Sequence, residues 1–356
     1  MIKNKLRYYG SQIVDDYTDY LKNFTLEQIE ALTAEQIKSS INRTKLPSLT
    51  IPREYGGLGF KLEDALHVLH DVAYMAPSAA LMLCMHYHVV STIAKFPDSF
   101  SFSSEILNNI STKNLLVASA FAESGASQNI FQTSVSAKVC GDSVVVDGSK
   151  RPCTMSSIAD FIAVSIATEE QLPGIAIVSR DTKGLSSRPF WPGDIVLGTD
   201  SNEVIFDNVK LDSEWVTFAR DASFENYLRY GLVCFNLLIG AAYSGVTKAI
   251  VDKLKDNVLR KSSEGVEIKG KLAQCFYSLV GISSAFKLED LDHFVPEVLS
   301  MRYQIQKMLK EIKNQATDNI GSRIYLSDIG LNYLLRVVDL MPFHPVTRSG
   351  FDLLIE

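Results

Sequence analysis

Residues 148–157, with the sequence GSKRPCTMSS, gather several side chains that could do chemistry. The segment contains the cations Lys150 and Arg151, the thiol of Cys153, and the hydroxyls of Thr154, Ser156 and Ser157. A thiol becomes a nucleophile when its pKa is lowered, and the two preceding cations are the one visible cause for Cys153. Because loops carry function only in some cases, a strand end with solvated charges is the alternative.

Residues 119–130, with the sequence SAFAESGASQNI, form a second candidate for ligand binding. Small residues let a ligand approach the backbone closely, and consecutive free N–H groups can hold an anion. An ordinary loop has the same composition, so the segment alone does not establish a site.

Four clustered histidines do not predict a metal centre. His67 and His70 share one face of a helical pattern, whereas His86 and His88 point to different faces. A zinc site needs convergent ligands, commonly including a cysteine or a carboxylate. We therefore expect no metal, and we interpret these residues as ordinary helix histidines.

The stretch IPREYGGLGF, residues 51–60, is rich in glycine but matches no phosphate-binding loop. A dinucleotide fingerprint needs G-x-G-x-x-G between a strand and a helix, and a Walker loop needs G-K-[ST]. We predict a joint between two helices. The chain also has no G-x-S-x-G nucleophile elbow.

Composition excludes some classes of function. The chain has 356 residues, of which 46% are hydrophobic, and a net charge of -6 without a basic block, so nucleic acid is not an expected partner. The five cysteines form no C-x-x-C pair, which favours reduced thiols in a cytoplasmic location. Residues 231–246 are apolar but short for a membrane span, and we interpret them as a buried core helix.

The hydrophobic period divides the chain into three regions. Residues 1–114 show helical spacing, for example in LEQIEALTAEQIKSSI and LEDALHVLHDVAYM. Residues 115–216 alternate with period two, and the pairs Gly141-Asp142 and Asp147-Gly148 are turn signals that indicate a sandwich or barrel. Helical spacing returns over 217–356. We predict an α+β multidomain fold in which two helical layers flank the β domain.

Taken together, these segments resemble the acyl-CoA dehydrogenase superfamily over nearly the whole chain. IPREYGGLGF is similar to the family's P-x-E-Y-G-G-L-G segment, and AFAESGASQNI to its T-E-P-x-A-G-S-D flavin loop. GSKRPCTMSS is similar to the G-x-K-x-[WF]-I-T strand, and LGTDSNEVIFDNV to the L-G-x-R stretch. The resemblance implies a helical N-terminal domain, a middle β domain and a C-terminal four-helix bundle.

The resemblance also implies roles for single residues around FAD. The positions it assigns to the cofactor are Phe121, Ala122, Ser127, Gln128, Cys153, Thr154 and Met155, with Arg260 as a bundle arginine lent to a neighbouring subunit's FAD. Backbone and threonine donors would hold the flavin, which carries the redox chemistry. Pro152 stands where the family has an aromatic residue, and Asp200 where it has the L-G-x-R arginine.

The family's catalytic glutamate has no match here. In the family this glutamate commonly lies in a late loop, and the corresponding residues 341–350 of this chain read MPFHPVTRSG, without a glutamate. A second family location lies at the start of the long bundle helix, where this chain has Tyr230-Gly231. Glu225 is nearby but does not align with that position. A late histidine loop resembles the flavin monooxygenase branch, which needs no base for an alpha proton. His344 is then the candidate acid or base, although a loop histidine packed between two prolines explains it equally well.

These observations lead to one main hypothesis and two alternatives. The main hypothesis is a flavin-dependent oxidoreductase acting on an acyl thioester, carried by coenzyme A or by an acyl carrier protein. The alternatives are a flavin monooxygenase of the same fold and a non-catalytic relative that serves as a binding module. The resemblance further implies a homodimer or homotetramer.

Overall fold

A computed structural model gives the structure of residues 11–123, 132–221, 223–254, 263–318, 320–348 and 350–351. The N-terminal helices are α1 (Ser11–Leu21), α2 (Leu26–Glu30), α3 (Ala34–Asn42), α4 (Leu62–Met75), α5 (Pro77–Lys95) and α6 (Ser103–Lys113). The strands are β1 (Val117–Ala120), β2 (Ser136–Cys140), β3 (Ser143–Cys153), β4 (Phe161–Ala167), β5 (Pro173–Ser179), β6 (Leu185–Arg188), β7 (Asn202–Asp212) and β8 (Val216–Phe218). The C-terminal helices are α7 (Ser223–Leu254), α8 (Ser263–Ala285), α9 (Leu291–Asp318), α10 (Ser322–Ser327) and α11 (Ile329–Val338).

The order helices, strands, helices follows the predicted periodicity. Helix gives way to strand between Lys113 and Val117, and strand to helix between Phe218 and Ser223. We keep 1–114, 115–216 and 217–356 as the proposed domains.

The eight strands form one mixed sheet in the order β6-β7-β3-β2-β4-β5-β8, with β1 parallel to β4. Strands β2 and β3 are antiparallel, and Cys140 pairs with Ser143 across Gly141-Asp142, which confirms that turn. The second predicted turn is wrong. Asp147-Gly148 lies inside β3, where the register against β7 shifts between Val146 and Gly148. Such a bulge uses the same residue types as a turn, so the pattern alone did not separate them.

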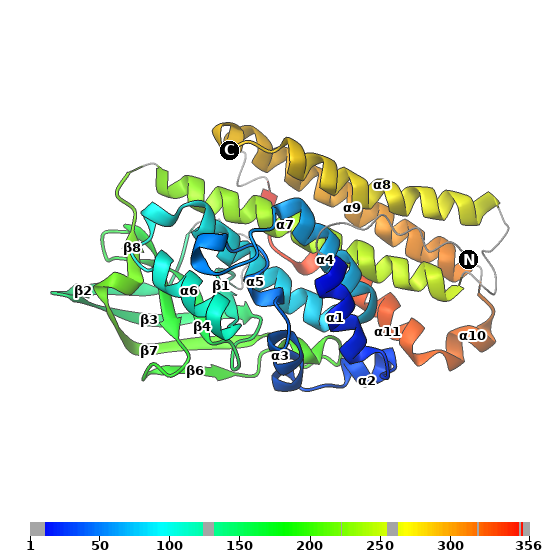
Figure 1. Ribbon diagram of the computed structural model, residues 1–356, viewed down its shortest axis with the longest axis horizontal. Helices are drawn as coiled ribbons and strands as arrows, with labels where there is room; N and C mark the ends of the chain where they lie inside the picture. The colour runs from blue at the N-terminus through cyan, green and yellow to red at the C-terminus, as the bar shows by residue number, and fades with distance from the viewer. Residues whose placement is uncertain are drawn as a thin grey trace.

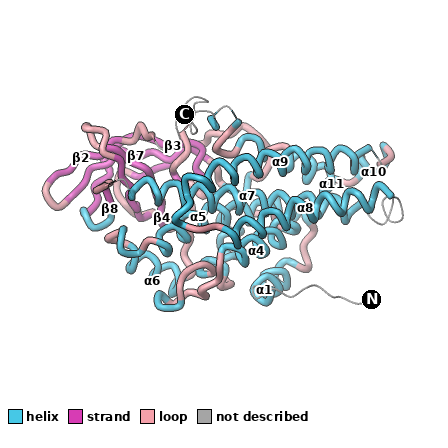
Figure 2. The backbone as a smooth tube through the Cα atoms, turned by 90° about the horizontal axis from the view of Figure 1, so that it is seen from above, coloured by secondary structure: helices cyan, strands magenta, loops and turns pink. Residues whose placement is uncertain are grey.

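The two helical regions pack directly on each other. Figure 1 shows the strands gathered at one end of the molecule, while α7, α8 and α9 run along its length. Figure 2 shows the same helices from above. Helices α4 and α5 pack against α7, which also packs against α8, α9 and α11. We predicted that the two helical regions would lie on either side of the strands. This part of the prediction is wrong, because α4 and α5 bury their apolar faces largely against α7.

Local signals explain most of the helix boundaries. The segment LEDALHVLHDVAYM coincides with α4. The pattern LEQIEALTAEQIKSSI divides into α2 and α3, because Thr25 and Thr33 each begin a new helix with a capping box. In each box the threonine side chain accepts from the backbone of a glutamine three residues later.

Helix α7 is the centre of the hydrophobic core. Residues 224–254 are long and apolar enough to cross a membrane, but 94% of the apolar window is buried inside the protein. This burial supports the interpretation of residues 231–246 as a core helix. A second apolar cluster lies between α5, α6 and the strands, and it includes Ile93, Phe100 and Ile175.

The glycine-rich stretch 51–60 is a compact turn that leads into α4. The Gly59 N–H donates to Ile51 O at 2.8 Å, and Gly57 N–H donates to Pro52 O at 3.2 Å. A Cβ on Gly57 would lie 2.1 Å from Ile51 O, so a larger residue does not fit. The geometry agrees with the predicted joint.

The contact between α4 and α7 yields a stability prediction. A Cβ on Gly245 would lie 2.1 Å from the backbone oxygen of His70, so Gly245→Ala must push the two helices apart. We expect a loss of about 1–3 kcal/mol in the free energy of unfolding, measured in urea. Gly270→Ala, on the exposed face of α8 with nothing within 4 Å, is the control and should add about 0.5–1 kcal/mol. Equal effects of both substitutions would contradict the close approach.

Candidate active site

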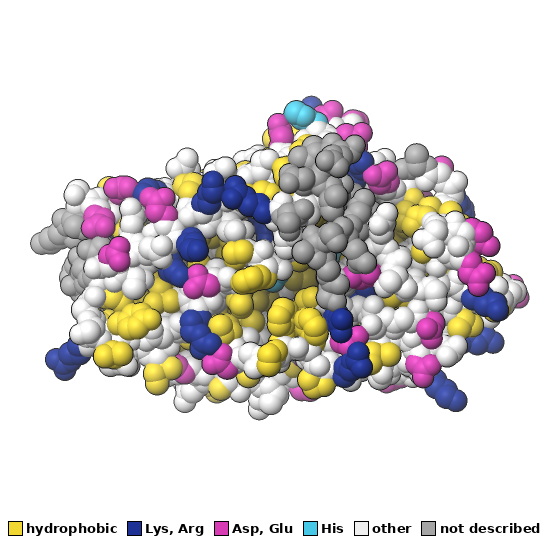
Figure 3. Space-filling view, turned by 180° about the vertical axis from the view of Figure 1, so that it is seen from behind, with side chains coloured by type: hydrophobic (Ala, Val, Ile, Leu, Met, Phe, Trp, Pro, Cys, Tyr) yellow, Lys and Arg dark blue, Asp and Glu magenta, His cyan; other side chains and the backbone are white. Residues whose placement is uncertain are grey.

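A cavity of about 900 Å³ lies where α5, α7, the sheet and the segment after α11 meet. One end is closed, because the lining side chains of Ile93, Phe100 and Ile175 are buried. The other end opens past Trp191, Leu197 and Phe343, which are 52%, 62% and 73% exposed. Figure 3 shows hydrophobic side chains gathered around a hollow near the centre of one face. A deep apolar cavity of this size suits a cofactor together with a small molecule.

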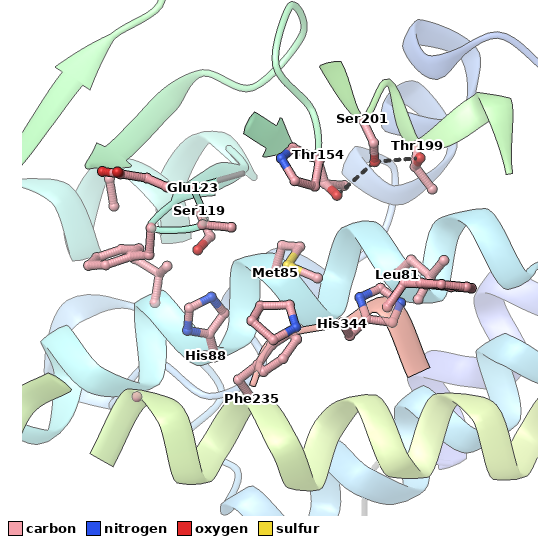
Figure 4. A pocket seen from close by; sticks show the side chains of 18 of the residues that line it. Leu81, Met85, His88, Ser119, Glu123, Thr154, Thr199, Ser201, Phe235 and His344 are labelled. Carbon is pink, nitrogen blue, oxygen red and sulfur yellow. Dashed lines mark hydrogen bonds between the residues drawn. The ribbon is translucent and has the colours of Figure 1, made fainter. Parts of the chain in front are cut away.

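The helical wall of the cavity is mostly apolar, and its polar members include His88 and Thr92. Residues three or four apart on α5 face the cavity because they share one side of the helix. The contributing residues are Leu81, Met85, His88 and Thr92 on α5, and Leu228, Gly231 and Phe235 on α7. Figure 4 shows His88, Met85, Phe235 and His344 on this side.

The opposite wall carries a row of hydroxyl groups. Thr154 Oγ1 lies 2.9 Å from Ser201 Oγ, which lies 2.8 Å from Thr199 Oγ1 (Figure 4). The Thr199 hydroxyl in turn donates to Val196 O at 2.7 Å. The chain of hydrogen bonds fixes these hydroxyls on the β side of the cavity.

Asp200 organises the loop behind these hydroxyls. Its carboxylate accepts hydrogen bonds from the Ser157 backbone at 2.6 Å and from the Ser157 and Ser156 hydroxyls at 2.9 and 3.1 Å. The side-chain amide of Asn202 donates to the other carboxylate oxygen of Asp200, Oδ1, at 2.7 Å. The residue that stands in place of the family's arginine therefore holds the end of β3 against the start of β7.

Glu123 lines the cavity but is already paired. Its carboxylate forms an ion pair with Lys150, whose side chain is 0% exposed, and accepts from the Ser134 backbone at 2.8 Å. Burial works to raise the pKa of Glu123, but these hydrogen bonds outweigh it and lower that pKa. Lys150 is therefore a buried structural cation, and the alternative of solvated charges on 148–157 is wrong for this residue.

His344 sits in a loop that a buried arginine holds in place. The Arg302 guanidinium, on α9 and 0% exposed, donates to the carbonyl oxygens of Val346, Met341 and His344 at 2.7, 2.8 and 2.9 Å. The His344 Nε2 atom lies 2.8 Å from the Tyr243 hydroxyl on α7. Burial, followed by the charge of Arg302, lowers the pKa of His344 to about 3.

His88 faces the same cavity from α5. Its ring packs edge-on to Phe235 at 5.5 Å and Phe121 at 6.4 Å between centroids. Burial, with a smaller effect of His86, lowers the pKa of His88 to about 3. Both cavity imidazoles are therefore neutral at physiological pH.

The predicted site residues divide into three groups. Phe121, Ala122, Thr154 and His344 line the cavity together with Pro152. Cys153 and Met155 are buried and do not line it. Burial also raises the pKa of Cys153 to about 12, which contradicts the nucleophile hypothesis. Ser127, Gln128 and Arg260 lie outside the described residues.

Sequence reasoning missed several members of the site. These are Thr199, Ser201, Tyr243 and Arg302. The partners of Tyr243 and Arg302 are distant in sequence, whereas Thr199 bonds to Val196 and Ser201 within its own segment. The L-G-x-R-like segment was the one signal near Thr199. Within the described ranges, no group of three His, Cys, Asp or Glu is arranged to hold a metal ion.

The buried histidine next to the cavity yields a pH prediction. Val117 N donates to Nδ1 of His86 at 3.1 Å, and Nε2 lies 2.7 Å from Pro47 O, so the ring is held neutral. Burial lowers its pKa from 6.5 to about 4. Between these values the unfolded chain binds a proton that the folded protein does not, so stability falls as pH falls.

The test compares the wild type with His86→Gln in urea at several pH values. The wild type should be the more stable at pH 7.5, and the difference in unfolding free energy should shrink as pH falls toward 4. His293→Gln, at an exposed position, should leave the pH dependence unchanged. A constant difference between wild type and His86→Gln would contradict the low pKa.

Comparisons with known proteins agree with the fold. No family model matches the chain. Isobutylamine N-hydroxylase of Streptomyces viridifaciens is 26% identical over 322 residues, which cover 85% of this chain and 83% of that protein. A putative acyl-CoA dehydrogenase of Bacillus subtilis is 26% identical over 214 residues, covering 58% of this chain and 54% of the relative.

A solved structure shows the same fold over almost the full length. FMN-bound TdsC from Paenibacillus sp. A11-2 superposes with a TM-score of 0.84 at 16% identity, covering 96% of this chain and 95% of that chain. The sequence relatives include both hydroxylating and dehydrogenating enzymes. Together with the helix–strand–helix architecture, these comparisons show that the chain is similar in sequence and in fold to flavoenzymes of the acyl-CoA dehydrogenase type.

Proposed function

We propose that the protein is a flavin-dependent monooxygenase that acts on a small, mostly apolar molecule. The observation that carries this proposal is the state of the carboxylates around the cavity. Among the described lining residues these are Glu123, Asp194 and Asp200. Glu123 is paired with Lys150, Asp194 with Arg336, and Asp200 with the hydroxyls of the adjacent loop.

A dehydrogenase needs a carboxylate free to remove an alpha proton. Gly231, at the second family location, lines the cavity without a side chain that could serve. Glu225 is 51% exposed and pairs with Arg229 on the outside of α7. Each of the described carboxylates is therefore already engaged by a cation or by hydroxyl and backbone donors, and none is the unpaired, desolvated base that proton abstraction requires.

The cavity residues fit a flavin. An isoalloxazine ring is flat and apolar on its faces, with polar atoms at its edge. The hydroxyls of Thr154, Ser201 and Thr199 offer polar partners on one wall, and Trp191 offers an aromatic face at the opening. When bound in its reduced form, the flavin would supply the electrons that activate dioxygen.

The identity of the flavin remains part of the proposal. The family resemblance implies FAD, whereas the solved neighbour TdsC is bound to FMN. We propose FAD with FMN as the alternative, and titration with each distinguishes them.

A small aliphatic amine is the proposed substrate class. Isobutylamine N-hydroxylase, which aligns with 85% of this chain, is named for the N-hydroxylation of isobutylamine. The imidazoles of His88 and His344 are neutral, so they add no positive charge to the cavity that would repel an amine. The closed end beside Ile93 and Ile175 would exclude water from the alkyl group.

Oxidation of an acyl thioester is the second candidate. It is favoured by the similarity to the Bacillus subtilis protein, which is named as a putative acyl-CoA dehydrogenase. A thioester on coenzyme A or on an acyl carrier protein would enter from the open end. We also propose the homodimer or homotetramer and the cytoplasmic location that the sequence led us to expect.

Trp191 gives a direct test of flavin binding, because the chain has only one other tryptophan. Trp215 stacks on Phe161 at 6.1 Å and is not among the cavity residues. In Trp215→Phe, added flavin should quench the remaining indole strongly. In Trp191→Phe, quenching should be weak and the dissociation constant about 2–10-fold higher, since an aromatic contact is worth about 0.5–1.5 kcal/mol. Equal quenching in both variants would place the flavin elsewhere.

The activity test offers reduced flavin, oxygen and isobutylamine, with mass spectrometry of the product. We expect a gain of one oxygen atom that depends on the protein. The parallel arm mixes flavin-loaded protein with butyryl-CoA without oxygen and follows the visible spectrum. Bleaching there, with no hydroxylated amine in the first arm, would overturn the monooxygenase proposal in favour of the dehydrogenase.

A further inference from the structure

The hydrogen bond between Tyr243 and His344 has a direction that the surroundings determine. Tyr243 Oη lies 2.8 Å from His344 Nε2, and the tyrosine is 1% exposed. Either atom can donate, because a neutral imidazole carries its proton on one of two nitrogens. Which atom donates decides what His344 offers to the cavity.

The buried tyrosine must donate. Its hydroxyl has no other hydrogen-bond partner among the described residues. If Nε2 carried the proton and donated to the tyrosine oxygen, the tyrosine O–H would be buried without an acceptor, which is costly. Burial also raises the pKa of Tyr243, so the hydroxyl keeps its proton. The Tyr243 O–H therefore points to the Nε2 lone pair.

The imidazole cannot accept a second proton easily. Arg302 on α9 holds its charge close to the ring, because one of its hydrogen bonds goes to the backbone oxygen of His344 itself. Tyr243 on α7 and Arg302 are the ionisable groups in contact with this residue, and the Phe235 ring covers it at 6.3 Å. Burial and this cation lower the pKa of His344, as described above. The ring is neutral, with its proton on Nδ1.

The second ring nitrogen is open to the cavity. His344 lines the cavity, and within the described part of the chain its Nδ1 has no hydrogen-bond partner. An unpartnered nitrogen that is not fully buried must be accessible, and the Nδ1 atom of His344 is not among the fully buried, unpartnered polar atoms of the described residues. A ligand in the cavity can reach it.

We infer that His344 acts as a neutral hydrogen-bond donor through Nδ1–H, and that Tyr243 is the positioning residue that sets this tautomer. A general base needs a free lone pair, and the one lone pair of this ring is occupied by the tyrosine. The ligand atom facing His344 is then an acceptor, such as an oxygen atom of the substrate or of the bound flavin. The tautomer itself stands independently, whereas its role in turnover rests on the proposed function.

The test is the ¹⁵N spectrum of the imidazoles in the unmodified protein at pH 7, which needs neither flavin nor substrate. His344 should show the Nδ1–H pattern, assigned by its loss in His344→Asn. His86 is the internal reference, because Val117 N donates to its Nδ1 and its proton must lie on Nε2. The two rings should therefore show opposite tautomers in one spectrum. An Nε2–H or doubly protonated His344 would overturn the inference.

Variants then connect the tautomer to turnover. Tyr243→Phe removes the donor, and His344 should shift toward the Nε2–H form or a mixture, while His86 stays unchanged. His344→Asn keeps an N–H donor near the Nδ1 position but cannot act as a base. It should retain activity within about 10-fold of wild type, whereas His344→Ala should lose about 10²–10³-fold. Equal losses in Asn and Ala would overturn the donor role, and absence of activity in the wild type would instead count against the proposed function.

Discussion

The geometry of the candidate site depends on the buried charge of Arg302. Among the residues that the structure describes, its guanidinium is balanced by three main-chain oxygens of the loop that follows α11 and by no carboxylate. Removing a charge from water is costly unless hydrogen bonds compensate, so the guanidinium and the loop stabilise each other. The same contact fixes the backbone of His344, and the charge of Arg302 adds to the larger effect of burial in keeping the ring neutral. Arg302 therefore contributes both to the position and to the protonation of that histidine.

The cavity owes its shape to helix packing in a similar way. Helix α7 packs closely on α4 at Gly245 and on α5 at Gly231. Both positions are glycines, so α7 has no side chain of its own at these two contacts. The sheet closes the opposite side with hydroxyls and with the paired Glu123. Charge is thus compensated locally at each wall, and the interior between the walls stays apolar. This arrangement suits chemistry from which water is excluded.

Local sequence signals were enough for much of the fold. The 3.6-residue period located α4, and Gly141-Asp142 located the β2–β3 hairpin. Asp147-Gly148 misled, because a bulge and a turn use the same residue types. Thr154 and His344 were found through motif order, and both line the cavity. Tyr243 and Arg302 were missed, since the hydrogen bond from Tyr243 joins residues 101 positions apart and no local pattern reports such a contact. The helical layers were misplaced because periodicity shows that a face is buried but not what covers it.

The depth of the cavity has a consequence for the order in which ligands bind. Within the part of the chain that the structure describes, Ile93 and Ile175 line it at buried positions, whereas Trp191 and Phe343 line it at exposed ones. A large ligand at the exposed positions would obstruct the exit of a smaller molecule seated beside the buried ones. We therefore expect the inner ligand to bind first, and release of the outer ligand can then limit the rate of the whole cycle.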